Sequence, residues 1–316
     1  MTGTSQSLIS AADEAGLSRA VNLLRAGELV AVPTETVYGL AARADSDDAV
    51  AKIYRAKGRP DFNPLIVHVA GLDQAKQIGQ FDVRAEKLAR DFWPGALTLV
   101  VERLQDAPIA AAVTAGLPTI AIRCPAHPIM RSLLKEAGVP LAAPSANRSG
   151  AISPTTAQHV ARSLRTDVGM ILDGGACEAG IESTIVALRD DGSWQILRDG
   201  PITSEQIGNV LGRGEVRGIS NGEVEAPGQL TSHYSPGKPM RLGAVAPEPG
   251  EFHIGFGEVQ GDYNLSPSGD LAQAAARLYS ALHVAAESSK PAIAVAIVPE
   301  TGIGSAINDR LRRAAA

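Results

Sequence analysis

The sequence predicts an α/β protein with two domains. Short apolar segments of strand length alternate with amphipathic helical segments through roughly the first 210 residues, which is the pattern of a sheet covered by helices. The chain has 316 residues, more than one compact hydrophobic core usually holds. Between residues 212 and 239 glycine, proline, serine and charged residues replace the alternation. We therefore expect a first domain over residues 1–211, a linker over 212–239 and a small α/β domain over 240–316.

The first elements are recognised by their ends. Residues 18–26 have the pattern of a short helix with Ser18 as its N-cap. A helix over 45–57 begins with acidic residues and ends with cations, the order that the helix dipole favours. A third helix, 84–92, ends shortly before Pro94. The apolar segments between them predict strands at 29–32, 65–69 and 97–101.

Later elements follow from the same rules. Ser153 and Pro154 resemble an N-cap and a proline at the first helical position, so they predict a helix that ends at Leu164. Segments 184–188 and 194–198 flank a turn and predict paired strands. The other expected elements are helices 129–137 and 271–286 and strands 119–123, 170–172 and 293–298.

Composition narrows the class of protein. Hydrophobic residues make up 45% of the chain and charged residues 20%, which is ordinary for a globular protein. A net charge of −5 and an aromatic content of 4% argue against a nucleic-acid-binding surface. Cys124 and Cys177 have neither metal-ligand spacing nor the density of a disulfide scaffold. Residues 1–12 lack a signal-peptide pattern and no apolar run has the length of a membrane span, so we expect a cytoplasmic protein.

Four cations lie close together against this overall charge. Lys52, Arg55, Lys57 and Arg59 fall within eight residues, and no acid lies between them. Such a cluster is typical of an anion site, most often for phosphate. The alternative is that these residues only complement the dipole at the end of a helix. The hydroxyl-rich segment 34–36 that precedes them favours a site.

Familiar catalytic signatures do not account for this cluster. The chain contains no Walker phosphate loop, no G-x-G-x-x-G after a strand and no His/Cys cluster with zinc spacing. The acidic residues do not offer an obvious catalytic pair. A reaction carried by positioning and charge stabilisation is therefore favoured over one with a covalent nucleophile.

Two side chains stand out on apolar strands. The period of two in strand 119–123 places Thr119 and Arg123 on one face, so a hydroxyl and a guanidinium point the same way. A buried Arg123 needs a partner, either a structural acid or a carboxylate ligand. His68 also lies on an apolar strand, where a histidine is more often a satisfied core residue than a ligand contact.

The hydroxyl and amide candidates have equally ordinary alternatives. Ser145 and Asn147 follow a proline and are compatible with a simple turn. Ser183 opens a strand, and Ser153 is explained by helix capping alone. What favours a site is the excess of hydroxyl and guanidinium groups at strand ends, since ligands gather there in open α/β sheets.

Taken in order, these segments resemble the threonylcarbamoyl-AMP synthase family in its long, two-domain form. The resemblance rests on short motifs spread over nearly the whole chain. They are 33–40, Lys57-Gly58-Arg59-Pro60, 63–65, Pro144-Ser145-Ala146-Asn147, 182–184, 226–228, His233-Tyr234-Ser235-Pro236, 264–266 and 306–311.

The resemblance implies a fold and an activity. The fold would be a twisted, mostly mixed sheet around a concave YrdC-like cavity, with a second, smaller Rossmann-like domain beyond the linker. The activity would be the condensation of L-threonine, bicarbonate and ATP into threonylcarbamoyl-AMP with release of pyrophosphate. The Mg²⁺ would arrive with ATP, without a metal bound by the protein itself. A separate transferase complex would then modify tRNA, and direct tRNA binding would be weak or absent.

The resemblance also implies site residues. Lys57 and Arg59 would lie near the phosphates as catalytic cations. The residues similar to the threonine-binding set are Thr36, His68, Arg123, Ala143 and Ser183. The residues similar to the ATP-binding set are Arg59, Asn63, Thr119, Ser145, Ser153 and Arg198. His233 and Tyr234 resemble a linker segment that closes over the cavity as a gate.

Two alternatives belong to other classes of protein. An RNA-binding module would use the cation cluster and a concave sheet, although the acidic net charge and few aromatics disfavour it. A carbamoyl-transfer domain of the hydrogenase-maturation type would share the fold. The chain shows no appended zinc-finger or acylphosphatase-like region, which disfavours that alternative.

Overall fold

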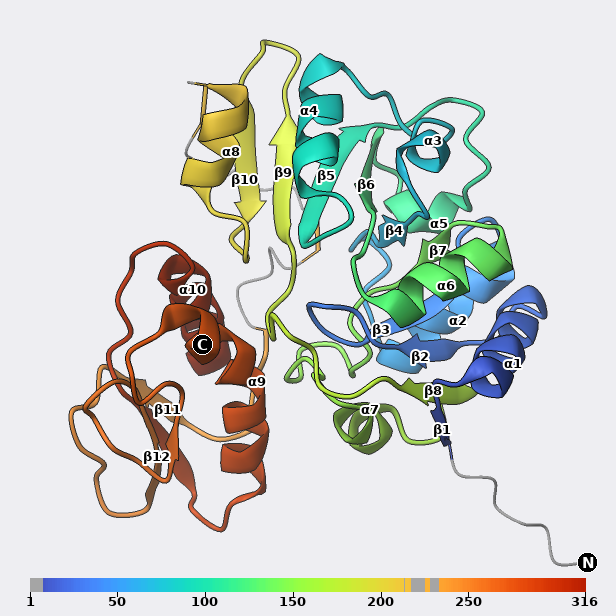
Figure 1. The fold of residues 1–316 in the computed structure, drawn as a ribbon. Helices are drawn as coiled ribbons and strands as arrows, with labels where there is room; N and C mark the ends of the chain where they lie inside the picture. Colours follow the sequence, from blue (N-terminus) through green and yellow to red (C-terminus); the bar gives the residue numbers. More distant parts are fainter. Residues whose placement is uncertain (1–7, 213, 217–224, 228–232) are drawn as a thin grey trace, which may run out of the picture.

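The protein is built on two separate sheets, each with its own helices (Figure 1). The computed structural model describes residues 8–212, 214–216, 225–227 and 233–316. Parts of the predicted linker, namely 213, 217–224 and 228–232, lie outside the described residues. Within the described part, one sheet has ten strands and the other four.

The large sheet mixes parallel and antiparallel pairs, as the predicted fold class requires. Its strand order is β1-β8-β2-β3-β7-β4-β6-β5-β9-β10. The β4–β6 pair is parallel, so the carboxyl ends of these two strands meet at one edge. The strands are β1 Ile9–Ala11, β2 Val30–Val32, β3 Gly39–Arg43, β4 Ile66–His68, β5 Leu97–Glu102, β6 Thr119–Arg123, β7 Leu141–Ala142, β8 Met170–Asp173, β9 Thr184–Leu188 and β10 Trp194–Arg198.

The helices of the large domain follow the predicted pattern, with corrections at two N-termini. The first helix begins at Glu14 because Asp13 caps it, accepting a 2.8 Å hydrogen bond from Gly16 N–H, and Ser18 lies inside the helix. Helix α7 begins later than predicted, because Thr156 is its N-cap and Ser153 lies before it. The helices are α1 Glu14–Arg25, α2 Asp47–Lys57, α3 Leu72–Ala75, α4 Val83–Phe92, α5 Ala111–Thr114, α6 Pro128–Ala137, α7 Ala157–Leu164 and α8 Ser204–Leu211.

Strand β3 was not predicted. Its residues Gly39, Leu40, Ala41 and Ala42 carry no β-branched side chain, so the local preference for a strand is weak. All four are buried, and the strand pairs with β2 on one side and β7 on the other. Burial in the centre of the sheet therefore decides its conformation.

The small domain is a parallel sheet packed against two helices. The strands β11 Met240–Leu242, β12 Glu251–Gly255, β13 Tyr263–Asn264 and β14 Ala292–Val295 lie in the order β11-β14-β12-β13. Helices α9 Leu271–Glu287 and α10 Gly304–Ala315 lie between this sheet and the large domain (Figure 1). The predicted helix 271–286 is confirmed, whereas the strand predicted to reach 298 ends at Val295.

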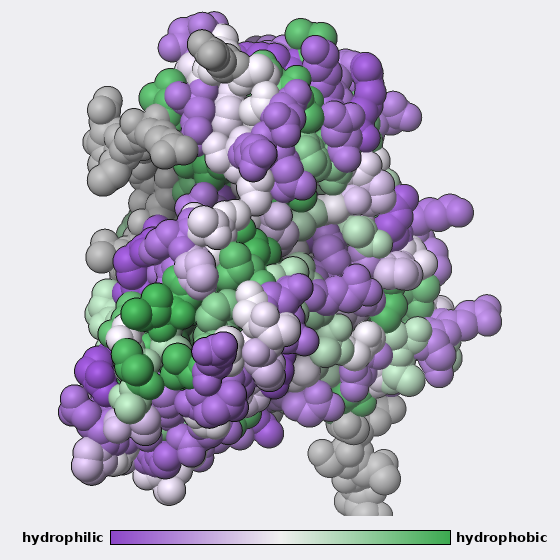
Figure 2. Space-filling view, turned by 60° about the vertical axis from the view of Figure 1, so that its left-hand side comes forward, coloured by the Kyte–Doolittle hydropathy of each residue, from purple (hydrophilic) through white to green (hydrophobic). Residues whose placement is uncertain are grey.

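Hydrophobic side chains remain exposed on the small domain. On the face shown in Figure 2, hydrophobic residues gather at mid-height on the left, above a mostly hydrophilic lower edge. Leu242, Val245 and Ile297 are exposed, and they lie at or just beyond the carboxyl ends of the adjacent strands β11 and β14. In the described part of the chain, no helix combines the length and the hydropathy that crossing a bilayer requires.

The two domains meet along helix α9. A Cβ atom on Gly180 would lie 2.4 Å from Ala276 Cα of this helix, so only glycine permits the close approach. Nearby, the rings of His159 and His283 stack across the interface with centroids 3.8 Å apart. Nδ1 of His159 lies 3.3 Å from the Thr155 N–H, which marks this nitrogen as an unprotonated acceptor.

This histidine pair predicts a loss of stability in acid. Burial, and then His283, lowers the pKa of His159 to about 3, and burial lowers the pKa of His283. The unfolded chain then binds more protons than the folded one from about pH 6.5 downward, so the free energy of unfolding falls as the pH falls. Arg162 opposes protonation of both rings, while Glu287 favours protonation of His283. Thermal melting between pH 8 and pH 5 should show a smaller slope in the double variant His159→Phe, His283→Phe. An unchanged slope would contradict this assignment.

Candidate active site

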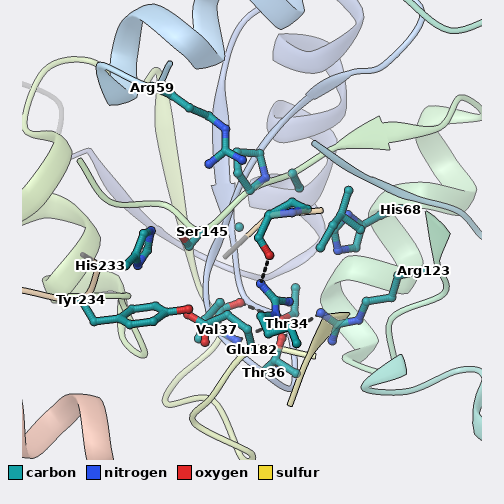
Figure 3. A pocket seen from close by; sticks show the side chains of 16 residues that line it. Thr34, Thr36, Val37, Arg59, His68, Arg123, Ser145, Glu182, His233 and Tyr234 are labelled. Atoms are coloured by element: carbon teal, nitrogen blue, oxygen red, sulfur yellow. Dashed lines mark hydrogen bonds between the residues drawn. The ribbon is translucent and has the colours of Figure 1, made fainter. Parts of the chain in front are cut away.

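A cavity lies where the carboxyl ends of β4 and β6, the segment between β2 and β3, and the β7–α7 loop converge (Figure 3). Three arginines line it, and Pro227, His233 and Tyr234 of the linker line its remaining side. The cavity has a volume of about 50 Å³, room for only a few water molecules. The residues predicted from the sequence that line it are Thr36, Arg59, His68, Arg123, Ala143, Ser145, Arg198, His233 and Tyr234.

Arg123 is held at the edge of the sheet by a buried acid. Its Nη2 donates a 2.5 Å hydrogen bond to Glu35 Oε1, its Nη1 one of 2.9 Å to Thr36 Oγ1, and its Nε one of 3.1 Å to Gly95 O. Burial alone would raise the pKa of Glu35, but Arg123 outweighs it and the pKa is lowered. Of the partners that the sequence left open for Arg123, the structure shows the structural acid. Three bonds leave two of the five N–H donors for a ligand.

The segment 34–37 forms a compact turn organised by one hydroxyl. Thr34 Oγ1 donates to Val37 O at 2.6 Å and accepts from the Thr36 and Val37 N–H groups. The hydroxyls of Thr34 and Thr36 are 2.9 Å apart. This local bonding fixes Thr36 against Arg123, so the hydroxyl-rich sequence has a structural cause as well as a place in the cavity.

His68 lies beside Arg123 in the sheet, because the two residues are direct register partners in the parallel β4–β6 pair. The side chain lines the cavity, and Nδ1 is buried with no hydrogen-bond partner among the described residues. Burial, and then Arg123, lowers the pKa of His68 to about 3, so the imidazole is neutral at neutral pH. A buried polar atom without a partner that lines a cavity is expected to bond to a ligand.

Arg59 is directed into the cavity by the end of helix α2. Gly58 caps the helix in the left-handed conformation, with φ of 60°, and turns the chain. The side chain of Arg59 is then fixed by Asn63: Nε donates to Asn63 O at 3.0 Å and Nη2 to Asn63 Oδ1 at 2.6 Å. Burial lowers the pKa of Arg59 to about 10, so the side chain stays charged at neutral pH.

Lys57 is buried away from the lining of the cavity. Its Nζ donates to Ser145 O at 2.5 Å, to Asn147 O at 2.6 Å and to Asn147 Oδ1 at 3.4 Å. These three oxygens use all three ammonium donors. Burial, and then Arg59, lowers the pKa of Lys57. In this structure Lys57 therefore does not face the cavity, and it fixes the 145–147 loop that carries Ser145.

The variant Lys57→Met should destabilise the protein. It removes a buried cation and its three hydrogen bonds to Ser145 O, Asn147 O and Asn147 Oδ1, a loss of about 3 kcal/mol, although Ser145 O keeps the hydrogen bond from the Asn147 N–H. Lys52→Met on the same helix is the control, because Lys52 is half-buried and pairs with the half-exposed Glu28, a contact worth about 1 kcal/mol or less. Urea unfolding measures both. Equal effects of the two substitutions would contradict the role of Lys57.

Arg198 and Glu182 form the wall nearest the small domain. Arg198 donates from Nε to Ser183 O at 3.0 Å and from Nη2 to Ser183 Oγ at 3.1 Å. Glu182 lines the cavity and accepts 2.6 Å from Ser153 Oγ. Burial would raise the pKa of Glu182, but Arg310 and Arg198 lower it to about 2. Ser153 and Ser183 therefore support this wall from behind.

His233 and Tyr234 close the cavity on the side of the linker. Their rings are 4.1 Å apart, and Tyr234 reaches toward Glu182 and Val37 (Figure 3). Nδ1 of His233 is buried and has no hydrogen-bond partner in the described part of the chain. Burial lowers the pKa of His233 to about 4, so this ring is also neutral at neutral pH.

The structure separates the predicted residues into two groups. Those that do not line the cavity are Lys57, Asn63, Thr119, Ser153 and Ser183. Four of them, all except Thr119, form hydrogen bonds to residues that line it. Thr119 lies at the opposite end of β6 from Arg123, where it pairs with Glu102, so sharing a face does not bring it to the cavity. Thr34, Glu35 and Glu182 were not predicted as site residues, although all three lie within the motifs 33–40 and 182–184.

Comparison with known proteins shows to which family this chain belongs. A family model described as telomere recombination (Sua5, YciO and YrdC) matches residues 22–200, and one for the C-terminal domain of threonylcarbamoyl-AMP synthase matches 202–316. The threonylcarbamoyl-AMP synthase of Bacillus subtilis is 42% identical over 95% of this chain and 92% of its own. This chain belongs to the threonylcarbamoyl-AMP synthase family. The synthase of Pyrococcus abyssi is 37% identical over 93% of this chain and 92% of its own.

Solved structures agree with this membership. Pyrococcus abyssi Sua5 complexed with L-threonine superimposes with a TM-score of 0.88 at 34% identity, over 97% of this chain and 96% of that one. A phosphate- and nucleotide-bound HypF superimposes with a TM-score of 0.53 at 20% identity, over 60% of this chain and 30% of that one. This more distant likeness concerns the fold alone. The predicted family and fold class are confirmed.

Proposed function

We propose that this synthase condenses L-threonine, bicarbonate and ATP into threonylcarbamoyl-AMP and pyrophosphate. Membership of the family supports the activity, and the relative solved with L-threonine supports the amino-acid substrate. The observation that carries the proposal is the lining of the cavity by Arg59, Arg123 and Arg198, against one carboxylate, Glu182. Buried cations in excess suit a ligand with a carboxylate and a triphosphate.

The threonine subsite is proposed around Arg123. The two free donors of its guanidinium would hold the substrate carboxylate, and the neutral imidazole of His68 would bond to the substrate through Nδ1. Thr36 and Ala143 would complete the contact surface. Ser183 would act from behind, by holding Arg198.

The ATP subsite is proposed on the opposite wall. Arg59 and Arg198 would face the phosphates, with Ser145 beside them. Asn63 would act through Arg59 and Ser153 through Glu182, since these are the groups that they bond. Thr119 would reach the nucleotide only if the nucleotide extends beyond the cavity toward the start of β6.

The reaction needs no nucleophilic side chain. The threonine amine adds to carbon dioxide derived from bicarbonate and forms a carbamate. A carbamate oxygen then forms a bond to the α-phosphorus of ATP as the bond to the pyrophosphate oxygen breaks. The arginines stabilise the negative charge on the phosphates, and the proton of the amine passes to bicarbonate or solvent. Binding both substrates at one edge of the sheet supplies the alignment.

Mg²⁺ would enter as part of the ATP substrate. Within residues 8–212, 214–216, 225–227 and 233–316, no group of three or more His, Cys, Asp or Glu side chains could hold a metal ion. The two acids at the cavity are engaged, Glu35 with Arg123 and Glu182 with Arg310. The phosphates and water would therefore supply most of the ligands, and Mg²⁺ would offset charge on the leaving pyrophosphate.

The gate would have to open for substrates to enter. A cavity of about 50 Å³ holds a few waters, much less than ATP requires. His233 and Tyr234 would swing out to admit the nucleotide and return to exclude water from the adenylate.

We further propose a catalytic domain over 1–211, the linker with its gate over 212–239 and a C-terminal domain over 240–316. The product would be passed to a tRNA-modifying transferase in the cytoplasm.

The activity is tested by pyrophosphate release. Purified protein should release pyrophosphate from ATP only when L-threonine and bicarbonate are both present. Release that does not depend on threonine would reject the proposal. Salt-sensitive tRNA binding tighter than ATP binding would instead favour the RNA-binding alternative, and ATP-dependent use of carbamoyl phosphate would favour the carbamoyl-transfer alternative.

A further inference from the structure

The small domain contacts the catalytic cavity through one fully buried cation, Arg310 of helix α10. Its Nε lies 3.2 Å from Glu182 Oε2, and its Nη1 donates a 2.5 Å hydrogen bond to Asp199 O. Both partners belong to the large domain, and Glu182 lines the cavity. Tyr279 of α9 donates to the same carboxylate at 2.8 Å. The carboxylate that faces the substrates is therefore held by two side chains from the other domain.

The gate rests on the same cluster. The guanidinium carbon of Arg310 lies 5.9 Å from the centroid of the Tyr234 ring. The centroids of the Tyr234 and Tyr279 rings are 5.4 Å apart. The N–H of His233 donates a 3.2 Å hydrogen bond to Arg313 O, also in α10. Both gate residues therefore contact helix α10: Tyr234 lies against Arg310, and His233 bonds to Arg313 O.

Two features of the closed state are energetically unfavourable. Tyr234 has a φ of 64°, a left-handed conformation that costs a non-glycine residue about 1–2 kcal/mol. Nη2 of Arg310 is buried and has no hydrogen-bond partner among the described residues. A closed state with such costs depends on the remaining contacts of the cluster, so it is expected to be sensitive to each of them.

We propose that Arg310 is a positioning residue of the synthase, which couples the C-terminal domain to closure of the gate. It neutralises Glu182 at the cavity wall and provides the cationic surface on which the Tyr234 ring rests. The C-terminal domain is then part of the catalytic machinery, because without its helix α10 the gate would lack its contact surface. The effect of Arg310 on catalysis rests on the proposed function, whereas its contact with the gate can be tested without substrates.

The test is hydrogen exchange of the gate in the full chain. In Arg310→Met, the amides of His233 and Ser235, which bond to Arg313 O and Gly150 O, should exchange at least about tenfold faster, the equivalent of about 1.4 kcal/mol. Amides in the core of the small domain, such as Leu278 and Ile254, should keep their rates. A merely structural role would accelerate them as well. Arg312→Met is the matched control, since Arg312 is exposed on the same helix and pairs with Glu300.

A second readout concerns the product. The fraction of released pyrophosphate that is matched by intact threonylcarbamoyl-AMP should fall in Arg310→Met and stay unchanged in Arg312→Met. Gate exchange and product yield equal to wild type would overturn the proposal. If Arg310→Met does not fold, Tyr279→Phe decides, because it removes a donor to Glu182 and keeps the ring: faster gate exchange supports the coupling, and unchanged exchange overturns it. Failure of the wild type to make the adenylate would reject the proposed function alone.

Discussion

Replacing Arg123 with alanine should lower kcat/KM for L-threonine by about 100-fold or more, the range expected when one member of a buried, hydrogen-bonded charge pair is lost. The variant removes the proposed partner of the substrate carboxylate. It also leaves Glu35 buried without its cationic partner, although the Ala126 and His127 N–H groups still donate to it. Both effects act on the same edge of the sheet, so the loss should appear chiefly in the dependence on threonine.

Three variants separate these effects. Glu35→Gln keeps Arg123 but weakens its orientation, so it should show a smaller loss than Arg123→Ala. Arg123→Lys keeps the charge without the planar fork and should remain defective. Arg90→Ala is the control, because Arg90 is exposed and pairs with Glu86 at the surface. An unchanged KM for threonine in Arg123→Ala would reject the assignment of the threonine subsite.

Replacing Arg59 with alanine should weaken the use of ATP by a similar factor, about 100-fold in kcat/KM. Its guanidinium is fixed by Asn63 and Pro64 before any ligand binds, so little orientation is left to be gained on binding. Arg55→Ala is a matched control: it lies one turn earlier, belongs to the same cation cluster and is exposed. Steady-state kinetics with ATP varied at saturating threonine and bicarbonate measure both. Equal losses in the two variants would mean that the cluster acts through general charge and not through Arg59.

The sequence predicted the parts of the site that depend on short-range pattern. The alternation of strand 119–123 marked Arg123, whereas the apolar strand of His68 favoured a core residue and only the family resemblance marked this histidine. Both residues line the cavity side by side. The predicted helix 45–57 placed Arg59 just beyond a helix end, and the structure shows that Gly58 caps this helix. In each case the backbone period or a cap determines the direction of the side chain.

What the sequence could not show depends on contacts between distant segments. Lys57 has the same local pattern as Arg59, and only the position of the 145–147 loop decides that its ammonium bonds to carbonyls and not to a ligand. Thr119 satisfies the same periodicity as Arg123, but the length of the strand separates them. The pair of Glu182 with Arg310 joins residues 128 positions apart in two domains, a pairing that no local pattern encodes.

The same contacts explain why a separate C-terminal domain belongs to this enzyme. Its helices α9 and α10 supply Tyr279, Arg310 and the carbonyl group of Arg313, and all of these groups contact either Glu182 or the gate. Sequence composition marks this region as a small α/β unit after a linker, which suggests an appendage. The structure instead places it against the wall of the cavity.

The central claim is that one cavity seats threonine and the triphosphate side by side. A crystal structure with L-threonine and a non-hydrolysable ATP analogue tests it most directly. We expect the threonine carboxylate within hydrogen-bond distance of Arg123, the amine facing the α-phosphate, and the phosphates between Arg59 and Arg198. Density for the two ligands in separate places, or a nucleotide bound away from Arg59, would contradict it.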